Sequence, residues 1–216
     1  PRMSVKSLTS LAMLTALAYI VMIMSKALPQ VSGFLQLDLK DTIICVGGFL
    51  FGPMAAAISS IVVAAIEMFT YSDTGIIGCI MNLLSTCSFA FTAAYVYKRR
   101  HTMTGAIAGL VTGTVVMVTT MLLWNYLITP LYMTGTSRSD IAGMLVPVFL
   151  PFNLLKAGLN SACILLLYKP VVNGLRRAGL LPAPPAKGGS RIGITAFAAL
   201  LLVTCILFVL VLRGII

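Results

Sequence analysis

The segment PFNLLKAGLN, residues 151–160, places an amine and two amides inside an otherwise apolar stretch. At about 100° of rotation per residue, Asn153, Lys156 and Asn160 fall within roughly 60° of one another on one helical face. An ionisable side chain at mid-depth in a membrane costs roughly 2.5 to 3.5 kcal/mol, so one that persists usually faces a cavity or a partner. These residues are therefore candidates for a polar binding site. Two alternatives stay open: Lys156 could lift its amine to the interface, because Pro151 predicts that the helix begins there, and the amides could bond to another helix.

A second group of polar side chains stands in QLDLKDT, residues 36–42, ahead of a short apolar run. Asp38 and Asp41 have a structural explanation, because carboxylates cap the first turn of a helix and are favoured there by the helix dipole. In the topology argued below, both also lie on the outer side of the membrane, where residues 151–160 begin. A pocket could therefore close between the two segments.

The segment LLWNYLITPLY, residues 122–132, sets Asn125 between Trp124 and Tyr126. Trp and Tyr are enriched at membrane interfaces, so an aromatic belt explains the two rings. It does not explain the amide, which is a candidate for the same site.

Two further polar residues interrupt apolar spans. Asn82 lies in GCIMNLLS, where an interhelical hydrogen bond is the structural alternative to ligand binding. Glu67 needs a cation, and the sequence does not choose among Lys26, Lys40 and Lys156 as its partner.

The elements that must position these residues are membrane helices. Of the 216 residues, 59% are hydrophobic and 9% are charged, and the mean hydropathy is +1.04, values that exclude a soluble domain. The formal charge of +10 does not indicate nucleic-acid binding, because the Lys and Arg residues punctuate apolar spans and do not form a surface cluster. We therefore predict an all-α integral membrane protein, in contact with lipid.

Metal binding and enzymatic catalysis are not expected. The five cysteines are scattered through apolar segments without a CxxC pair, and His101 is the only histidine. The sequence has no HExxH, GxSxG or phosphate-cradling motif. No catalytic residue, metal site or resident cofactor is predicted.

The hydropathy pattern predicts seven apolar spans. They cover residues 8–24, 42–51, 54–70, 75–97, 105–128, 146–168 and 192–212. The second is too short to cross a membrane alone, and Gly52 and Pro53 end it abruptly. It must either tilt inside a bundle or gain depth from the segment before it.

Lysine and arginine predict the orientation, because cytoplasmic loops carry an excess of both. With a cytoplasmic N-terminus, ten of the fifteen lie inside, four lie outside and Lys156 is within a span. The outside set is Lys26, Lys40, Arg138 and Arg213. This count agrees with six spans whose two ends are both cytoplasmic.

The chain divides into three parts. Residues 1–180 form the six-helix domain, and LPAPPAKGGSR, residues 181–191, reads as a Pro- and Gly-rich linker. Residues 192–216 hold a seventh helix without a polar face, which we expect to be peripheral, to touch lipid on most sides and to carry no chemistry.

The order of these segments along the chain is informative. LDLKD before a short helix, FGP after it, GCIMN, WNYLITPLY and LPFNLLKAGLN follow one another in the chain. This order resembles the substrate-binding S-component of energy-coupling factor (ECF) vitamin transporters, specifically its riboflavin-binding branch. The resemblance covers about residues 4–180.

The resemblance implies a six-helix protein of the bacterial plasma membrane that binds riboflavin from outside, under the loop between its first two helices. Its partners would be a transmembrane scaffold subunit and two ATPase subunits. Ala12 and Ala16, four residues apart, look like the surface that docks on the scaffold, since small residues let helices approach closely. Riboflavin would be the transported ligand, and the choice between riboflavin and FMN stays open.

The residues expected to bind substrate combine the family's positions with the polar side chains described above. They are Asp38, Asp41, Thr42, Asn82, Asn125, Tyr132, Asn153, Lys156 and Asn160. The chain departs from the family pattern at Ile43, where a proline is expected, and at Lys40, where a small polar residue is expected. In the third helix, Glu67 stands in place of a basic or amide pair. An S-component for another vitamin and a purely structural bundle, which would hold no ligand, are the alternatives.

Overall fold

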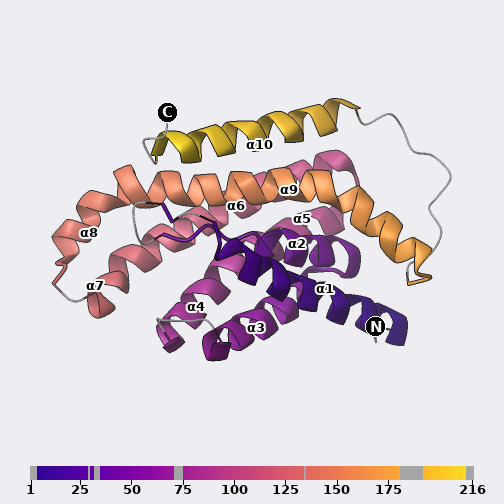
Figure 1. The fold of residues 1–216 in the computed structure, drawn as a ribbon, viewed down its shortest axis with the longest axis horizontal. Helices are drawn as coiled ribbons and strands as arrows, with labels where there is room; N and C mark the ends of the chain where they lie inside the picture. Colours follow the sequence, from indigo (N-terminus) through magenta and orange to yellow (C-terminus); the bar gives the residue numbers. More distant parts are fainter. Residues whose placement is uncertain are drawn as a thin grey trace.

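The structure, a computed structural model, describes residues 4–28, 30–31, 35–70, 75–133, 135–180 and 192–212. In these ranges the chain is almost entirely helical (Figure 1). The elements in chain order are α1 (Val5–Ser25), α2 (Lys40–Phe51), α3 (Pro53–Thr70), α4 (Gly75–Thr86), the π-helical turn η1 (Cys87–Phe91), α5 (Thr92–Arg99), α6 (Met103–Leu127), α7 (Thr129–Tyr132), α8 (Arg138–Met144), the π-helical turn η2 (Leu145–Phe149), α9 (Leu150–Arg177) and α10 (Ile192–Leu212).

Within the described ranges, five helical runs are long and apolar enough to cross a membrane. They are Val5–Ser25, Pro53–Thr70, Gly75–Arg99, Met103–Leu127 and Arg138–Arg177. The third and the fifth each join two helices through a π-helical turn, so that one predicted span corresponds to several elements. The all-α membrane architecture predicted from the hydropathy pattern is confirmed.

The helical run that carries Lys156 begins earlier than expected. A capping box at Ser137 and Asp140 starts it, and it then continues for 40 residues to Arg177. The helix α9 itself begins at Leu150 with Pro151 in its first turn, as expected, but the helical run extends back from there through η2 and α8. A proline removes one backbone donor and clashes with the turn before it. Here the wider π turn Leu145–Phe149 accommodates Pro147, four residues before Pro151.

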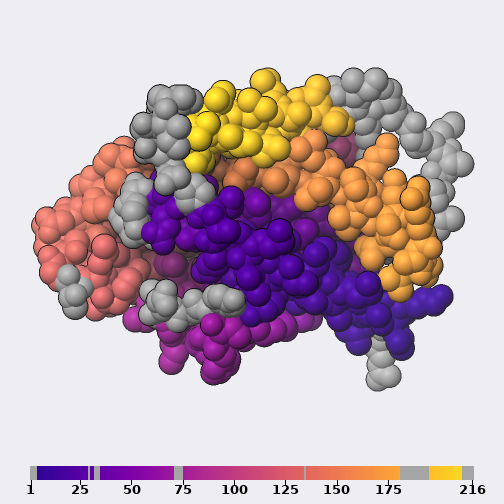
Figure 2. Space-filling view, in the orientation of Figure 1, coloured from indigo at the N-terminus to yellow at the C-terminus, as the bar shows by residue number. Residues whose placement is uncertain are grey.

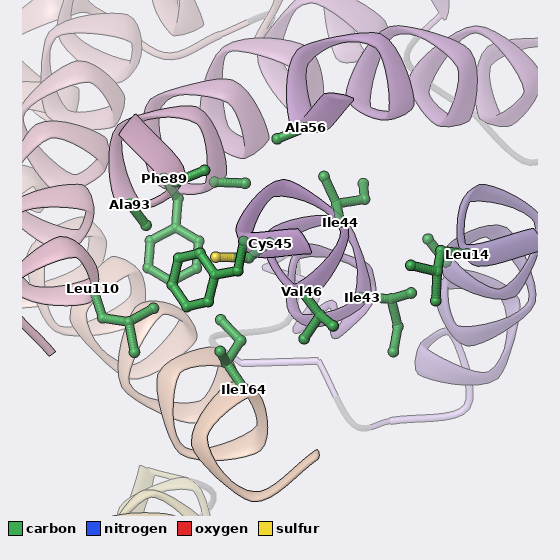
Figure 3. Packing of buried hydrophobic residues seen from close by; sticks show 14 of the residues in the cluster. Leu14, Ile43, Ile44, Cys45, Val46, Ala56, Phe89, Ala93, Leu110 and Ile164 are labelled. Carbon is green, nitrogen blue, oxygen red and sulfur yellow. The ribbon is translucent and has the colours of Figure 1, made fainter. Parts of the chain in front are cut away.

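The short helix α2 lies at the centre of the bundle. Every residue from Lys40 to Phe49 is buried, and helices from all sides contribute side chains to the core around it (Figure 3). At about 1.5 Å per residue its 12 residues span about 18 Å, well short of the hydrocarbon layer. Because α2 is surrounded by protein, its length does not have to match the membrane.

The end of α2 follows the sequence expectation. Gly52 has a φ of 98°, a conformation that favours glycine, and α3 begins at Pro53 directly after it. One turn earlier, a Cβ on Gly48 would lie 2.9 Å from the Cβ atoms of both Ala56 and Ala94. Glycine at that position therefore lets α3 and α5 approach α2 closely.

The C-terminal helix α10 has the bounds that the apolar pattern predicted, Ile192–Leu212. It runs antiparallel to α9 and lies against it on the outside of the bundle (Figure 1). The expected linker, residues 181–191, lies outside the described residues.

The loop between α1 and α2 folds back over one end of the bundle. Val31 and Leu35 form an isolated antiparallel bridge with backbone hydrogen bonds of 2.8 and 3.0 Å. Gln36 Nε2 donates to the carbonyl oxygens of Ser25 and Leu28, both at 3.0 Å. These contacts place residues 35–39 above the start of α2.

Candidate substrate-binding site

A cavity of about 620 Å³ opens at the end of the bundle that the α1–α2 loop covers. This volume is in the range of small-molecule sites, roughly 300 to 1,000 Å³. Its walls come from α1, the loop, α3, α4, α6, η2 and α9. The lining residues are Met22, Ser25, Lys26, Gln30, Leu35, Gln36, Leu37, Asp38, Glu67, Met68, Phe69, Thr70, Met81, Asn82, Ser85, Met121, Asn125, Phe149, Phe152, Asn153 and Lys156.

Helix α9 carries Lys156 into this cavity. The residue is 6% exposed, and its Nζ lies 3.3 Å from Ser85 Oγ and 3.4 Å from Asp41 Oδ2. Asp41 is fixed in turn by Thr86, whose hydroxyl donates to Asp41 Oδ1 at 2.7 Å. The amine is thus held inside the bundle by a carboxylate of α2 and a hydroxyl of α4, and it does not rise to the interface.

Three asparagines from different helices converge on the cavity. Asn153 Nδ2 donates to the carbonyl oxygen of Phe149 at 2.7 Å, while no donor in the described ranges reaches its Oδ1. Asn125 Nδ2 donates to the Met121 carbonyl at 2.7 Å. Asn82 lines the wall formed by α4. The site therefore offers an amide acceptor from Asn153 beside the amine donor of Lys156, one turn apart on the same helix.

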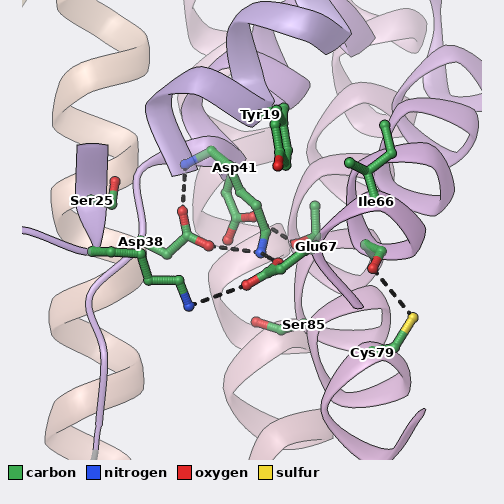
Figure 4. Close-up of polar contacts among 12 residues, drawn as sticks. Tyr19, Ser25, Asp38, Asp41, Ile66, Glu67, Cys79 and Ser85 are labelled. Carbon is green, nitrogen blue, oxygen red and sulfur yellow. Dashed lines mark hydrogen bonds and ion pairs between the residues drawn. The ribbon is translucent and has the colours of Figure 1, made fainter. Parts of the chain in front are cut away.

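The opposite wall carries a chain of charges that begins in the loop (Figure 4). Lys40 Nζ lies 2.7 Å from both Asp38 Oδ2 and Glu67 Oε2. Lys26 Nζ lies 3.4 Å from the second oxygen, Glu67 Oε1. Of the three cations left open for Glu67 in the sequence, Lys40 and Lys26 pair with it, and Lys156 pairs with Asp41.

The Asp38 carboxylate lies in the loop and accepts from the backbone N–H of Lys40 at 2.8 Å, which supports the first turn of α2. Burial alone would raise the pKa of this carboxyl, but the ammonium groups of Lys40 and Lys156 and the hydrogen bonds from Lys40 outweigh burial and hold that pKa below its usual range. Asp38 is therefore ionised when it faces the cavity.

Asn160 joins α9 to the loop and to α2. Its Nδ2 donates to the Asp38 carbonyl at 2.8 Å and to the Lys156 carbonyl at 3.0 Å, and its Oδ1 accepts from Thr42 Oγ1 at 2.7 Å. These bonds use the amide fully, so Asn160 supports the cavity wall from behind.

The structure brings five of the expected binding residues to the cavity wall: Asp38, Asn82, Asn125, Asn153 and Lys156. The other four are not among the lining residues. Asp41, Thr42 and Asn160 lie behind the wall in the contacts described above, and the Tyr132 hydroxyl lies 3.3 Å from Thr129 Oγ1 in α7.

Several lining residues carried no signal that singled them out in the sequence. Ser25 at the end of α1, Gln30 in the loop and Ser85 in α4 are ordinary polar residues, and only the fold brings them to the cavity. The aromatic wall, made by Phe69, Phe149 and Phe152, is equally unmarked among the many apolar residues of the chain.

Two other features bear on the choice of site. A second cavity, of about 600 Å³, is bounded by α2, α5, α6, α9 and α10 and is lined mainly by apolar and aromatic side chains, with Lys169 among them. It lacks the converging amides of the first cavity. In the part of the chain that the structure describes, no three His, Cys, Asp or Glu side chains are grouped so as to hold a metal ion.

The comparison with known families agrees with this geometry. The family described as the substrate-specific component of ECF transporters matches residues 6–168, three quarters of the chain. The chain belongs to this family. Its members are transport proteins and not enzymes.

Two similar proteins are named as riboflavin transporters. The chain is 31% identical over 178 residues to the riboflavin transporter RibU of Staphylococcus aureus (strain TCH60). The aligned region covers 80% of this chain and 93% of that protein. It is 26% identical over 187 residues to the riboflavin transporter FmnP of Bacillus subtilis (strain 168), and this alignment covers 82% of this chain and 98% of that protein.

A solved structure has the same fold. It is described as the S component of a bacterial ECF transporter, and it matches with a TM-score of 0.66 at 29% identity, over 80% of this chain and 98% of the other. The S-component fold, with its multi-pass membrane helices, is therefore confirmed. Helix α10 lies beyond the residues that the family match covers.

Proposed function

We propose that this chain is the riboflavin-binding subunit of an ECF-type transporter of the bacterial plasma membrane. It captures riboflavin from the outer side with high affinity, and a transmembrane scaffold with two ATPase subunits then drives release to the cytoplasm. The observation that carries this proposal is the mixed cavity on an S-component fold, with Asn153 and Lys156 presenting an acceptor and a donor side by side.

The cavity chemistry suits a flavin. One edge of isoalloxazine alternates carbonyl acceptors with an N–H donor, and it can pair with the Lys156 amine and the free acceptor of Asn153. Its dimethylbenzene end is apolar and fits the methionine and phenylalanine walls, made by Met22, Met81, Met121, Phe149 and Phe152. The ribityl hydroxyls are neutral donors and acceptors, for which Asp38, Gln36 and Ser25 are the nearest partners in the loop region.

The charges around the cavity favour an uncharged ligand. Among the described residues, Lys26, Lys40 and Lys156 face Asp38, Asp41 and Glu67, and each of these charges has an opposite partner within 3.4 Å. A cationic or anionic ligand would have to break one of these pairs in a partly desolvated site, where charges are costly. Riboflavin is neutral and requires no such exchange, whereas FMN adds a phosphate, for which the half-exposed Lys26 is the best-placed cation.

The orientation is inferred from the charged residues and the partners are inferred from the family. We place the N-terminus in the cytoplasm on the lysine and arginine distribution, which puts the cavity mouth outside. Ala12 and Ala16 are exposed on α1, as a docking face for a scaffold helix requires. No nucleotide-binding motif is present in the sequence, so ATP would act through partner subunits.

The absorbance spectrum of the purified protein tests this proposal. We expect flavin bands in protein purified from riboflavin-containing medium, and stoichiometric quenching of riboflavin fluorescence by protein from which the flavin has been removed. Competition by FMN, thiamine, biotin and folate then separates riboflavin from the alternative ligands. A colourless protein that does not quench riboflavin fluorescence would contradict the proposal and favour a structural bundle or another vitamin.

A further inference from the structure

The C-terminal helix α10 has one face that packs against the bundle and one that does not. Ala198 is fully buried and Cys205, two turns further along the same face, is 7% exposed. On the other face, Leu200 and Val203 are 66% and 51% exposed. A helix that served only as a membrane anchor would need no such stripe. The buried stripe shows that α10 has a defined seat on the protein.

That seat includes the α1–α2 loop as well as α9. A single apolar cluster, distinct from the central core, contains side chains of all three segments. From α10 it takes Leu201, Leu202, Cys205 and Val209, from α9 Phe152, Leu155 and Leu159, and from the loop Leu28, Val31, Leu35, Leu37 and Leu39. The loop leucines are thus packed on the side of the bundle where α10 lies.

The same loop residues form a wall of the substrate cavity. Leu35 and Leu37 line the cavity and also belong to the cluster, as does Phe152 of α9. Leu37 is 3% exposed, so it lies between the cavity and the cluster with almost no solvent contact. A shift of α10 would therefore remove packing from the segment that bounds the ligand.

Among the described residues of the loop, few other contacts hold this segment. They are the bridge between Val31 and Leu35, the two bonds of Gln36, the contacts of Asp38 with Lys40 and Asn160, and the bond from Leu39 N–H to Ser25 Oγ. A segment with few backbone hydrogen bonds depends on apolar burial for its position.

We propose that α10 is a brace that holds the α1–α2 loop closed over the cavity and sets how fast ligand leaves. The apolar stripe of α10 stabilises the closed loop by burying Leu35 and Leu37 between itself and the cavity. Displacing α10 from α9 frees the loop to open. The brace itself does not depend on the ligand's identity; naming riboflavin as the released ligand rests on the function proposed above.

Gly158 offers a way to lock the brace. A Cβ at position 158 of α9 would lie 3.2 Å from Cys205 Sγ of α10, close enough for a disulfide between the two helices. We therefore choose Gly158→Cys in a full-length chain that also carries Cys163→Ala, which removes the other cysteine of α9. The matched control adds Cys205→Ser, which cannot form the bridge.

Two readouts follow oxidation of this variant. Hydrogen exchange of the loop peptide, residues 28–39, reports loop opening without any ligand. Stopped-flow fluorescence reports riboflavin dissociation. We expect the bridge to form, to slow both processes by roughly fivefold, a change equivalent to about 1 kcal/mol, and to lose its effect on reduction, while the Cys205→Ser control does not respond. Absence of a bridge, or a bridge with unchanged exchange, would overturn the proposal.

A second pair of variants loosens the brace without touching Gly158. Leu202→Ala with Val209→Ala truncates two side chains on the face of α10 that meets α9 and the loop. Leu200→Ala with Val203→Ala makes the matched truncations on the exposed face. We expect roughly fivefold faster loop exchange and riboflavin dissociation in the first pair and no change in the second. Equal behaviour of the two pairs would overturn the brace.

The two proposals fail in different ways. If the loop exchange responds to α10 but riboflavin does not bind, the brace stands and the riboflavin assignment falls. If riboflavin binds but neither loop exchange nor riboflavin dissociation responds to the disulfide bridge or to Leu202→Ala with Val209→Ala, the brace falls and the riboflavin assignment stands.

Discussion

Lys40 and Glu67 form a buried ion pair, with Lys40 Nζ 2.7 Å from Glu67 Oε2 and the two side chains 2% and 4% exposed. Each residue differs from what the resemblance led us to expect, namely a small polar residue at position 40 and a basic or amide pair in the third helix. The structure relates the two residues, because the cation on α2 meets the anion on α3. Together with Asp38 they tie the loop, α2 and α3 together at the edge of the cavity.

The first prediction is that the two residues depend on each other. Lys40→Met leaves Glu67 with only Lys26 and Asp38 without its ion partner, and breaking a buried pair costs about 3 kcal/mol or more. We expect a clear loss of thermal stability in detergent for this variant, and a smaller loss for Lys40→Met with Glu67→Gln than the two single changes would add up to.

Lys169→Met is the matched control, since Lys169 is exposed on α9 and we expect little change there. Losses that simply add in the double variant would show that the pair is not coupled.

Helical periodicity predicted part of this site and missed part of it. It placed Asn153, Lys156 and Asn160 on one face of a helix, and the structure confirms that shared face. It could not show that the face meets two environments. Asn153 and Lys156 reach the cavity, while Asn160, one turn further along, meets the start of α2 and the loop.

Long-range contacts and proline tolerance set the limits of the sequence analysis. The partners of Glu67 stayed open because Lys40 is 27 residues away and meets it only when α2 inserts among the other helices. The last helical run of the six-helix domain is longer than predicted, because the apolar span was expected to begin at residue 146, whereas the helix continues back through the π turn and α8 to Arg138. By contrast, the bounds of α10 depend only on local hydropathy and were predicted correctly.

The second prediction concerns ligand contact. Asn153→Ala removes the acceptor that faces the cavity, and a lost hydrogen bond of a buried group costs about 1 to 3 kcal/mol. We expect riboflavin affinity, measured by fluorescence quenching, to fall roughly 10- to 100-fold. Lys156→Met should weaken binding to a similar extent, because it removes the donor that pairs with the same edge of the ring.

Asn173→Ala is the control for these changes, because Asn173 lies on the same helix and is exposed. Unchanged affinity in the Asn153 variant, with the flavin still bound, would take that residue out of the site.

The third prediction separates support from contact. Asn160 lies behind the cavity wall and bonds to Thr42, to the Asp38 carbonyl and to the Lys156 carbonyl. We expect Asn160→Ala to lower the thermal stability of the ligand-free protein more than Asn153→Ala does, since it leaves Thr42 without its amide partner. Thr42→Val should reproduce part of this loss.

Thermal unfolding of the ligand-free variants, followed by tryptophan fluorescence, measures the difference. If Asn160→Ala reduces riboflavin affinity while stability stays at the level of the unaltered protein, then Asn160 contacts the ligand directly, as first expected from the sequence.

The fourth prediction divides binding from uptake. Ala12 and Ala16 are exposed on α1, away from the cavity, so Leu at both positions should leave riboflavin binding intact. Larger side chains would hold a partner helix away from this face, because small residues are what permits close approach in a membrane. We expect uptake of labelled riboflavin into proteoliposomes containing the scaffold and ATPase subunits to fall at least tenfold, or about 1.4 kcal/mol. Ala108→Leu makes the same change on the exposed side of α6 and should have no effect. Normal uptake by the Ala12 and Ala16 variant would mean that the scaffold docks on another face.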